Sequence, residues 1–268
     1  MSLWSYTHVY TMLPTFAVLA VVAFLMRLWL IKKPYEIRMI PIKIISVILI
    51  LIEIGKQAYS ISQGYNLYHL PLHFCSMFLY VVPLMAFYRG KHYDKVNSFA
   101  CAAMTSLFFG MIIMPNVIYP EKNILGFFED YLSFHTTFFH NIVMLALFLV
   151  LSLDLHKSNG SRQETLFVTA LGFVFVAIAA TASYALNTNF SNFLHTTVGI
   201  MASVVESVEL VLGEVITRII YVASLVILHV LLLVVTNYVY TLICICKDKL
   251  IDAFHSRKIC NECGENGI

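Results

Sequence analysis

Charged residues are scarce in this sequence, and their scarcity excludes a soluble globular protein. Only 12% of the 268 residues are charged and 60% are hydrophobic, whereas an average soluble domain is about 25% charged and about 45–50% apolar. A water-soluble fold of this length cannot bury so much apolar surface, and a disordered chain would not contain it. The formal net charge of +2 is too small to indicate a nucleic-acid partner.

Cysteine is also sparse, and several familiar catalytic motifs are missing. The six cysteines do not form the framework of a disulfide-rich secreted protein; they are Cys75, Cys101, Cys244, Cys246, Cys260 and Cys263. The sequence contains no H-E-x-x-H, no G-x-S-x-G, no P-loop and no G-x-G-x-x-G. The usual signatures of soluble hydrolases and nucleotide-binding proteins are therefore excluded.

Long apolar runs are what the sequence does have. A bilayer core of roughly 30 Å needs about 20 mostly apolar residues in a helix. Stretches that meet this requirement lie at 10–31, 40–62, 69–88, 96–115, 131–153, 164–186 and 218–243. The sequence therefore predicts an all-α polytopic membrane protein, a bundle of seven transmembrane helices that crosses the plasma membrane several times.

The positive charges alternate along the chain and predict its orientation. Lys and Arg follow the first, third, fifth and seventh apolar runs, as at Lys32, Arg89, Lys157 and Lys247, and the other connections have almost none. Residues 1–10 carry no Lys or Arg, which argues against a cleavable signal peptide. By the positive-inside rule, the N-terminus is outside and the C-terminus is cytoplasmic.

Two domain-level features accompany the spans. We expect one transmembrane domain, 1–246, and a short cytoplasmic tail, 247–268, with the C-x-x-C pair of Cys260 and Cys263. A zinc site completed by Cys244 and Cys246 or by a nearby histidine, free thiols and palmitoylated Cys244 and Cys246 all stay open for this region. The connection 187–217 is moderately apolar but carries three glutamates, which favours an amphipathic helix at the outer interface.

Polar residues inside the second span share one face. Glu53, Lys56 and Gln57 are spaced i, i+3, i+4 in its outer half. One interpretation is a structural ion pair between Glu53 and Lys56 that holds helices together. The other is the polar wall of a functional site.

The third span opens with HLPLHFCS. Pro71 suits the first turn of a helix, so His73 is expected about one turn below the outer surface. Cys75 then lies roughly 200° around the helix from His73, which argues against a simple His73–Cys75 dyad and favours Cys75 as a small buried hydrophobe.

Two further groups of polar residues lie at the same depth. The fifth span begins YLSFHTTFFHN, with His135 and His140 about 140° apart around the helix. Asn187 and Asn189 follow the sixth span, where asparagine also favours turns. Because the polar residues of these spans share one depth, we predict a single outward-facing polar pocket. We expect the inner half of the bilayer to contain almost no such groups apart from Arg27.

Three short motifs carry a family resemblance. LPLHFCS, FHTTFFH and LNTNF resemble the YwaF-like family of bacterial integral membrane proteins, which looks distantly similar to a vertebrate multispanning acyltransferase family that remodels ether phospholipids. In the acyltransferase family a Pro-Cys-His motif and a histidine on a later helix are thought to support acyl transfer through the cysteine. The resemblance aligns His73 and His135 with these histidines, but Leu72 occupies the cysteine position and cannot act as a nucleophile.

We therefore expect an enzyme acting on a lipid or acyl chain of the outer leaflet. His73, His135 and Glu53 are the candidate catalytic residues, because histidine titrates near physiological pH and a carboxylate can orient it. Cys75, a threonine or the acceptor's own hydroxyl is the nucleophile. The candidate substrate-binding residues are Lys56, Gln57, His140, Asn187 and Asn189.

Other interpretations remain open at this point. The same pocket suits a transport or sensing protein that binds a small polar or amphipathic ligand, and the polar groups also suit a structural partner in an envelope complex. The sequence predicts no cofactor and no metal, membrane lipid rather than nucleic acid as the partner, and a bacterial plasma membrane as the location. Whether the protein forms a homo-oligomer stays open.

Overall fold

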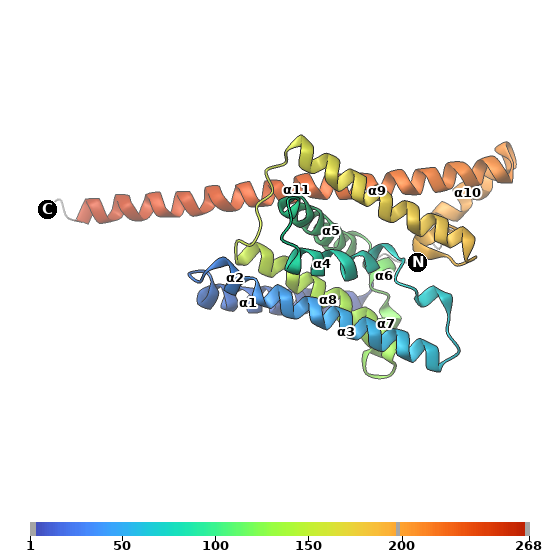
Figure 1. Cartoon of the computed structure of the whole chain (residues 1–268), viewed down its shortest axis with the longest axis horizontal. Helices are drawn as coiled ribbons and strands as arrows, with labels where there is room; N and C mark the ends of the chain where they lie inside the picture. Colours follow the sequence, from blue (N-terminus) through green and yellow to red (C-terminus); the bar gives the residue numbers. More distant parts are fainter. Residues whose placement is uncertain (1–3, 197–198, 266–268) are drawn as a thin grey trace.

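The computed structural model describes the backbone of residues 4–196 and 199–265 and the side chains of 4–196 and 201–250. Every regular element in this part of the chain is helical, so the all-α prediction is confirmed. The helices of the bundle lie side by side in Figure 1 and are α1 (Tyr6–Leu30), α3 (Ile40–Ser62), α4 (Phe78–Phe87), α5 (Tyr93–Ile113), α8 (Tyr131–Ser152), α9 (Arg162–Ala185) and α11 (Glu214–Glu265).

The other helical elements lie in the connections between the bundle helices. The α-helical ones are α2 (Tyr35–Arg38), α6 (Pro115–Ile118), α7 (Glu121–Leu125) and α10 (Gly199–Leu212). The 3-10 turns are η1 (Leu67–His69), η2 (Phe74–Met77), η3 (Gly126–Phe128) and η4 (Phe190–Asn192).

The connections alternate between the two ends of the bundle. At one end, Arg27 pairs with Asp154 at 3.1 Å, which joins the end of α1 to the α8–α9 connection. At the other end, the ring of His8 hydrogen-bonds the carbonyl of Tyr119 at 2.8 Å, which joins the start of α1 to the connection before α8. The ion pairs of Arg89 with Glu36 and of Lys247 with Asp154 bring the other predicted basic connections to the end of Arg27, so successive long helices run in opposite directions.

Several of these helices have the length and apolarity of membrane spans. By these criteria, α1, α5, α8, α9 and the Glu214–Leu250 part of α11 qualify, and Phe74–Phe87 forms a shorter apolar helix. Helix α3 is of similar length but carries Lys43, Glu53 and Lys56. The multi-pass character is thus supported, and the count of seven spans and their orientation stay predictions.

The third predicted span begins differently from the prediction. Instead of a helix from residue 69, the chain is extended at Leu70 and at His73, turns through η2, and enters α4 only at Phe78. Proline disfavours helical backbone in the residue before it, and Leu70 has φ −57° and ψ 140°. The expectation that Pro71 opens a helix with His73 one turn inside it is wrong.

Helix α5 lies at the centre of the bundle. It packs against α4, α8, α9 and α11, and its segment 99–104 is almost completely buried. Three alanines in this segment permit close helix approach, and the hydroxyl of Thr236 on α11 donates to the carbonyl of Ala102 at 2.9 Å. By contrast, α1 and α11 present large apolar side chains outward, such as Trp29, which is 81% exposed.

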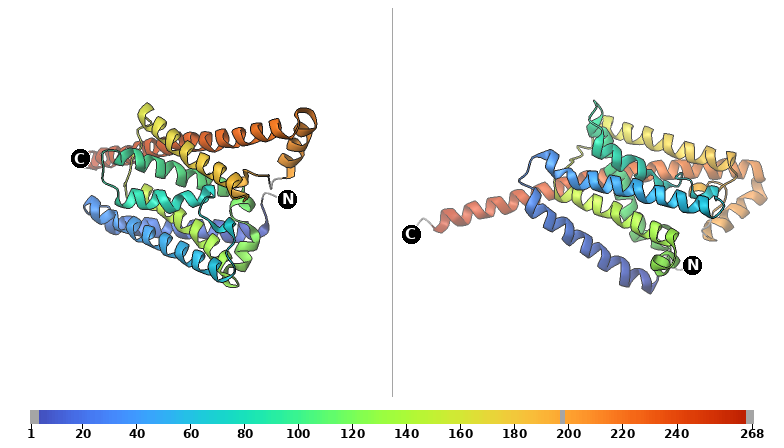
Figure 2. Two further views of the ribbon diagram at one scale, coloured as in Figure 1. Left: turned by 45° about the vertical axis from the view of Figure 1, so that its right-hand side comes forward. Right: turned by 60° about the horizontal axis from the view of Figure 1, so that its bottom comes forward.

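The last two helices form a hairpin. Helix α10 supplies the helix predicted within 187–217, and Gly213 joins it to α11 with φ +77°, a backbone conformation that glycine adopts readily. Helix α11 then runs without interruption past residue 247 and projects beyond the bundle (Figure 2). Cys244 is buried and Cys246 is exposed, while the side chains of Cys260 and Cys263 lie outside the described residues.

Candidate functional site

A carboxylate and an imidazole meet between α3 and α8. Nε2 of His135 lies 3.1 Å from Oε2 of Glu53, and the two residues are only 7% and 6% exposed. Helices α3 and α8 pack closely. Gly55 leaves room between them for the ring of Tyr131, and the hydroxyl of Tyr131 donates to the carbonyl of Ile52. The contact thus lies in a close-packed part of the helix interface.

The other oxygen of Glu53 binds two neighbours on its own helix. Oε1 lies 2.7 Å from Nζ of Lys56 and accepts a hydrogen bond of 2.7 Å from Nε2 of Gln57. The i, i+3, i+4 spacing therefore brings these side chains together as the sequence predicts. A carboxyl group surrounded by three donors matches the acceptor pattern of an ionised carboxylate.

Gln57 extends the cluster into the connection after α3. Its side-chain nitrogen also donates to the carbonyl of His69 at 2.8 Å, and its side-chain oxygen accepts from the hydroxyl of Tyr65 at 2.8 Å. The ring of His69 hydrogen-bonds the hydroxyl of Ser60 at 2.7 Å. Segment 65–69 is therefore tied along the polar face of α3.

His73 belongs to a neighbouring cluster. Its Nε2 lies 3.1 Å from the carbonyl of Tyr68, and its Nδ1 accepts from the backbone amide of Ser191 at 3.4 Å. The rings of Tyr68 and Phe190 lie edge-on to the imidazole, with centroid distances of 4.4 and 5.4 Å. Both ring nitrogens are thus engaged, which fits a neutral imidazole that donates from Nε2.

Cys75 follows His73 in η2 and is a partly buried free thiol. Because the backbone is extended at His73 and forms a 3-10 turn from Phe74, the angle expected for an ideal α-helix does not describe the relative directions of His73 and Cys75. The amide of Phe74 donates to the hydroxyl of Ser191 at 2.7 Å. Ser191 therefore binds both the ring of His73, through its amide, and the backbone of Phe74, through its hydroxyl.

His140 lies deeper along α8 than His135. It is 3% exposed, and neither ring nitrogen has a hydrogen-bond partner within the described part of the chain. The rings of Tyr119 and Phe139 lie edge-on to it, with centroids 6.4 and 6.0 Å away. Both ring nitrogens of His140 are therefore available to bind a ligand in the interior of the bundle.

The two candidate asparagines lie in the connection between α9 and α10. Asn189 donates to the carbonyl of His195 at 2.9 Å and accepts from the amide of Leu194 at 3.0 Å, so its side chain stabilises a turn. Asn187 is exposed and has φ +47°. Glu53, Lys56, Gln57 and His135 therefore meet directly, whereas the asparagines do not touch them.

Polar groups also occur at the opposite end of the bundle, where the sequence predicts almost none. The ring of His156 hydrogen-bonds the hydroxyl of Ser98 at 2.8 Å, and Glu164 is only 6% exposed. Asn97 and Asn237 are fully buried, and their amide groups have no partner among the described residues. The expectation of a nearly apolar inner half apart from Arg27 is corrected accordingly.

Sequence reasoning missed the residues that position the candidates. Tyr65, Tyr68 and His69 lie in the connection after α3, and Ser191 lies in the connection after α9. The repeated histidine in YHLPLH is the signal by which His69 could have been found. Ser191 has φ +49°, and no motif distinguishes it from an ordinary turn residue.

The bundle of apolar helices with a buried polar cluster defines the class of this protein, a polytopic helical membrane protein. Within that class, residues 3–235 match the TMEM164 family, and the chain belongs to this multispanning membrane family. Neither a curated protein nor a solved structure matches it.

Proposed function

We propose that this TMEM164-family protein is a membrane-embedded enzyme that transfers or hydrolyses an acyl group of a membrane lipid. The observation that supports this proposal is the buried hydrogen bond between Glu53 and His135. A carboxylate that orients an imidazole is a recurrent arrangement for general-base catalysis. The resemblance of the two histidine motifs to a lipid acyltransferase family points to the same chemistry.

In this proposal the two histidines have different roles. When Nε2 of His135 donates to Glu53, its Nδ1 carries the lone pair, and Nδ1 makes no hydrogen bond to the described residues. Nδ1 of His135 is thus available to accept a proton. His73 has both nitrogens occupied, so in this proposal it positions the 65–73 segment.

The reaction follows from these roles. The hydroxyl of an acceptor lipid, or of water, loses its proton to Nδ1 of His135 while its oxygen forms a bond to the acyl carbonyl carbon. The ester bond to the leaving alcohol then breaks, and His135 returns the proton to that alcohol. Cys75 is the alternative nucleophile: its sulfur forms a thioester as the ester bond breaks, the leaving alcohol takes the thiol proton, and the acceptor hydroxyl then cleaves the thioester and restores the thiol.

Glu53 and its other partners keep this base in place. Lys56 balances the charge of the carboxylate that also faces His135. Gln57 ties the same carboxylate to the carbonyl of His69, and so to the segment that leads to His73. His140, whose ring nitrogens have no partner among the described residues, and the exposed Asn187 are the proposed contacts for the polar part of the substrate.

The proposal includes a membrane placement. Seven helices cross the bilayer, with the end that carries Arg27, Asp154 and Lys247 in the cytoplasm, by the positive-inside rule. Lipids of the outer leaflet then reach the opposite end, where Glu53, His73 and His135 are found. The proposed location is a bacterial plasma membrane.

The test is an acyl-transfer assay on the full chain in lipid nanodiscs. A phospholipid with an isotope-labelled acyl chain is the donor and a lysophospholipid is the acceptor, and mass spectrometry detects the labelled product and labelled free fatty acid. We expect turnover by the wild type and its loss in His135→Asn. His92→Asn is the matched control, because His92 lies before α5 at the opposite end; equal turnover in all three proteins contradicts the proposal.

One observation favours transport as a second candidate function. Polar side chains without partners among the described residues occur at several levels of the bundle, namely Asn97, Thr105, Asn237 and His140. A passing polar ligand would supply the missing hydrogen bonds. Mass spectrometry of copurifying small molecules distinguishes the two functions, since a polar ligand that is retained without turnover supports transport or sensing.

A further inference from the structure

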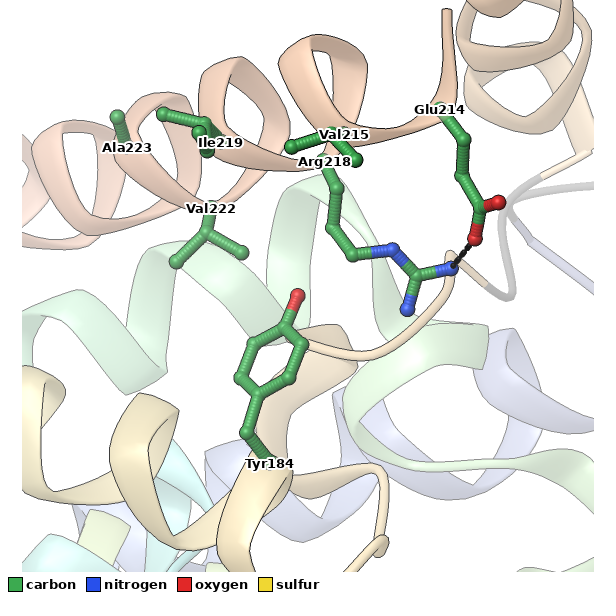
Figure 3. A pocket seen from close by; sticks show the side chains of 7 residues that line it. All are labelled: Tyr184, Glu214, Val215, Arg218, Ile219, Val222 and Ala223. Carbon is green, nitrogen blue, oxygen red and sulfur yellow. Dashed lines mark hydrogen bonds and ion pairs between the residues drawn. The ribbon is translucent and has the colours of Figure 1, made fainter.

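A groove runs between the end of α9 and the first turns of α11. It has a volume of about 490 Å³ and is lined by Tyr184, Glu214, Val215, Arg218, Ile219, Val222 and Ala223. Figure 3 shows Arg218 and Val222 pointing from α11 toward Tyr184. Most of the lining is apolar, and the charged groups lie toward the N-terminal end of α11.

The charged end of the groove contains one cation and one anion. Nη2 of Arg218 lies 3.2 Å from Oε1 of Glu214, and their side chains are 48% and 67% exposed. Arg218 is the only Lys or Arg between residues 163 and 246. An arginine isolated in so apolar a region is favoured at the level of lipid headgroups, where its guanidinium meets phosphate.

The apolar wall continues from this charged pair along α11. Val215 is 72% exposed and Ile219 is 65% exposed, so the described residues leave these side chains uncovered. Val215, Ile219 and Val222 lie along one side of α11, with Val215 beside the charged pair and Ile219 and Val222 beyond Arg218. A ligand with a charged head and a long hydrocarbon chain matches this succession.

We propose that the groove binds a zwitterionic phospholipid. The phosphate contacts the guanidinium of Arg218, the positively charged headgroup nitrogen contacts the carboxylate of Glu214, and one acyl chain follows Ile219 and Val222. The paired charges of Arg218 and Glu214 match a headgroup with one negative and one positive charge. This binding site does not depend on the proposed reaction at His135.

Photolabelling of the full chain in phosphatidylcholine vesicles tests the site. The probe is phosphatidylcholine with a photoactivatable acyl chain, and peptide mapping measures labelling of residues 214–223. Arg218→Gln removes the phosphate contact, and Ala223→Phe places a ring in the groove without touching the charges. We expect each change to lower this labelling by about fivefold, and Arg162→Gln, an exposed arginine at the other end of α9, to leave it unchanged.

The outcomes separate this site from ordinary lipid contact and from the reaction. Glu53→Gln is expected to label like the wild type, because the groove is independent of the Glu53–His135 pair. Equal labelling of wild type, Arg218→Gln and Ala223→Phe overturns the proposal, as does labelling spread evenly over α1 and α11. Stronger labelling by a phosphatidylglycerol probe than by phosphatidylcholine overturns the zwitterionic assignment. The thermal unfolding midpoint of each variant verifies that it is folded.

Discussion

Nε2 of His135 on α8 and Oε2 of Glu53 on α3 lie 3.1 Å apart, so two residues that are 82 positions apart in the sequence join these helices. Because both residues are buried, the carboxylate fixes which imidazole nitrogen carries the proton. If His135 acts as a base, it does so through Nδ1.

Glu53→Gln is expected to reduce kcat by up to about 10²- to 10⁴-fold, because a general base contributes this much only when it is positioned, and Glu53 positions His135. Glutamine keeps the shape of the side chain but can present its nitrogen to His135 and so change the tautomer. The pH profile of the acyl-transfer assay is the diagnostic readout, since loss of a purely structural ion pair would leave its shape unchanged. Wild-type kcat together with a wild-type profile would refute the orienting role of Glu53.

Gly55→Ala is expected to destabilise the α3–α8 interface. A methyl group at this position meets the hydroxyl of Tyr131, so the ring must move and lose its hydrogen bond to Ile52. Overpacking of this kind costs about 1–3 kcal/mol. The double variant Gly55→Ala/Tyr131→Phe lacks the hydroxyl, so its thermal unfolding midpoint should lie above that of Gly55→Ala. If the effects of the two changes on stability are additive, this contact is not the cause of the destabilisation.

Asp130→Ala should lower stability by about 1 kcal/mol, because Asp130 is the N-cap of α8 and accepts a hydrogen bond of 2.8 Å from the amide of Ser133. The adjacent Glu129 is also exposed and supplies the matched control, Glu129→Ala. Denaturation of the two purified variants measures the difference. A loss of similar size in Glu129→Ala would assign the effect to surface charge instead of the cap.

Asp154 is expected to make the protein sensitive to acid. Burial alone would raise the pKa of its carboxyl, but the hydrogen bond and charge of Lys247, together with Arg27, outweigh burial and lower the pKa below its ordinary value of 3.8. A lowered folded-state pKa contributes stability above the ordinary value, and this contribution is lost as the pH falls from that value through the folded-state pKa. Thermal unfolding midpoints of wild type and Asp154→Asn measured down to this range should converge; a constant difference at every pH would contradict this linkage.

The orientation can be tested by cysteine accessibility in a variant whose six native cysteines are replaced. Glu129→Cys lies at the end of the bundle that contains Glu53, and Lys91→Cys lies at the basic end; both native residues are exposed. In intact cells a membrane-impermeant maleimide should label the first and reach the second only after permeabilisation. The reverse pattern would invert the proposed topology.

The sequence could predict features that depend on neighbouring residues of the chain, but not features that depend on contacts between distant residues. The shared face of Glu53, Lys56 and Gln57 follows from helical periodicity alone, and all three side chains meet in the structure. The helical class follows in the same way from the length of the apolar runs. These features need no knowledge of which helices are neighbours.

The missed features depend on irregular backbone and on tertiary contacts. The segment before α4 leaves the helical path at Leu70, and the predicted relation between His73 and Cys75 fails with it. One of the two hydrogen-bond partners of His73 is the backbone amide of Ser191, 118 residues away. A backbone donor carries no side-chain signature, so no motif could reveal this contact.

The connection after α9 has a mechanical consequence. Tyr184 on α9 donates to the carbonyl of Phe193, Tyr221 on α11 donates to the carbonyl of Asn192, and Ser191 holds His73. Three consecutive residues thus form a linkage between two helices and an imidazole. Any change in the spacing of α9 and α11 at this level either displaces the ring of His73 or breaks one of these hydrogen bonds.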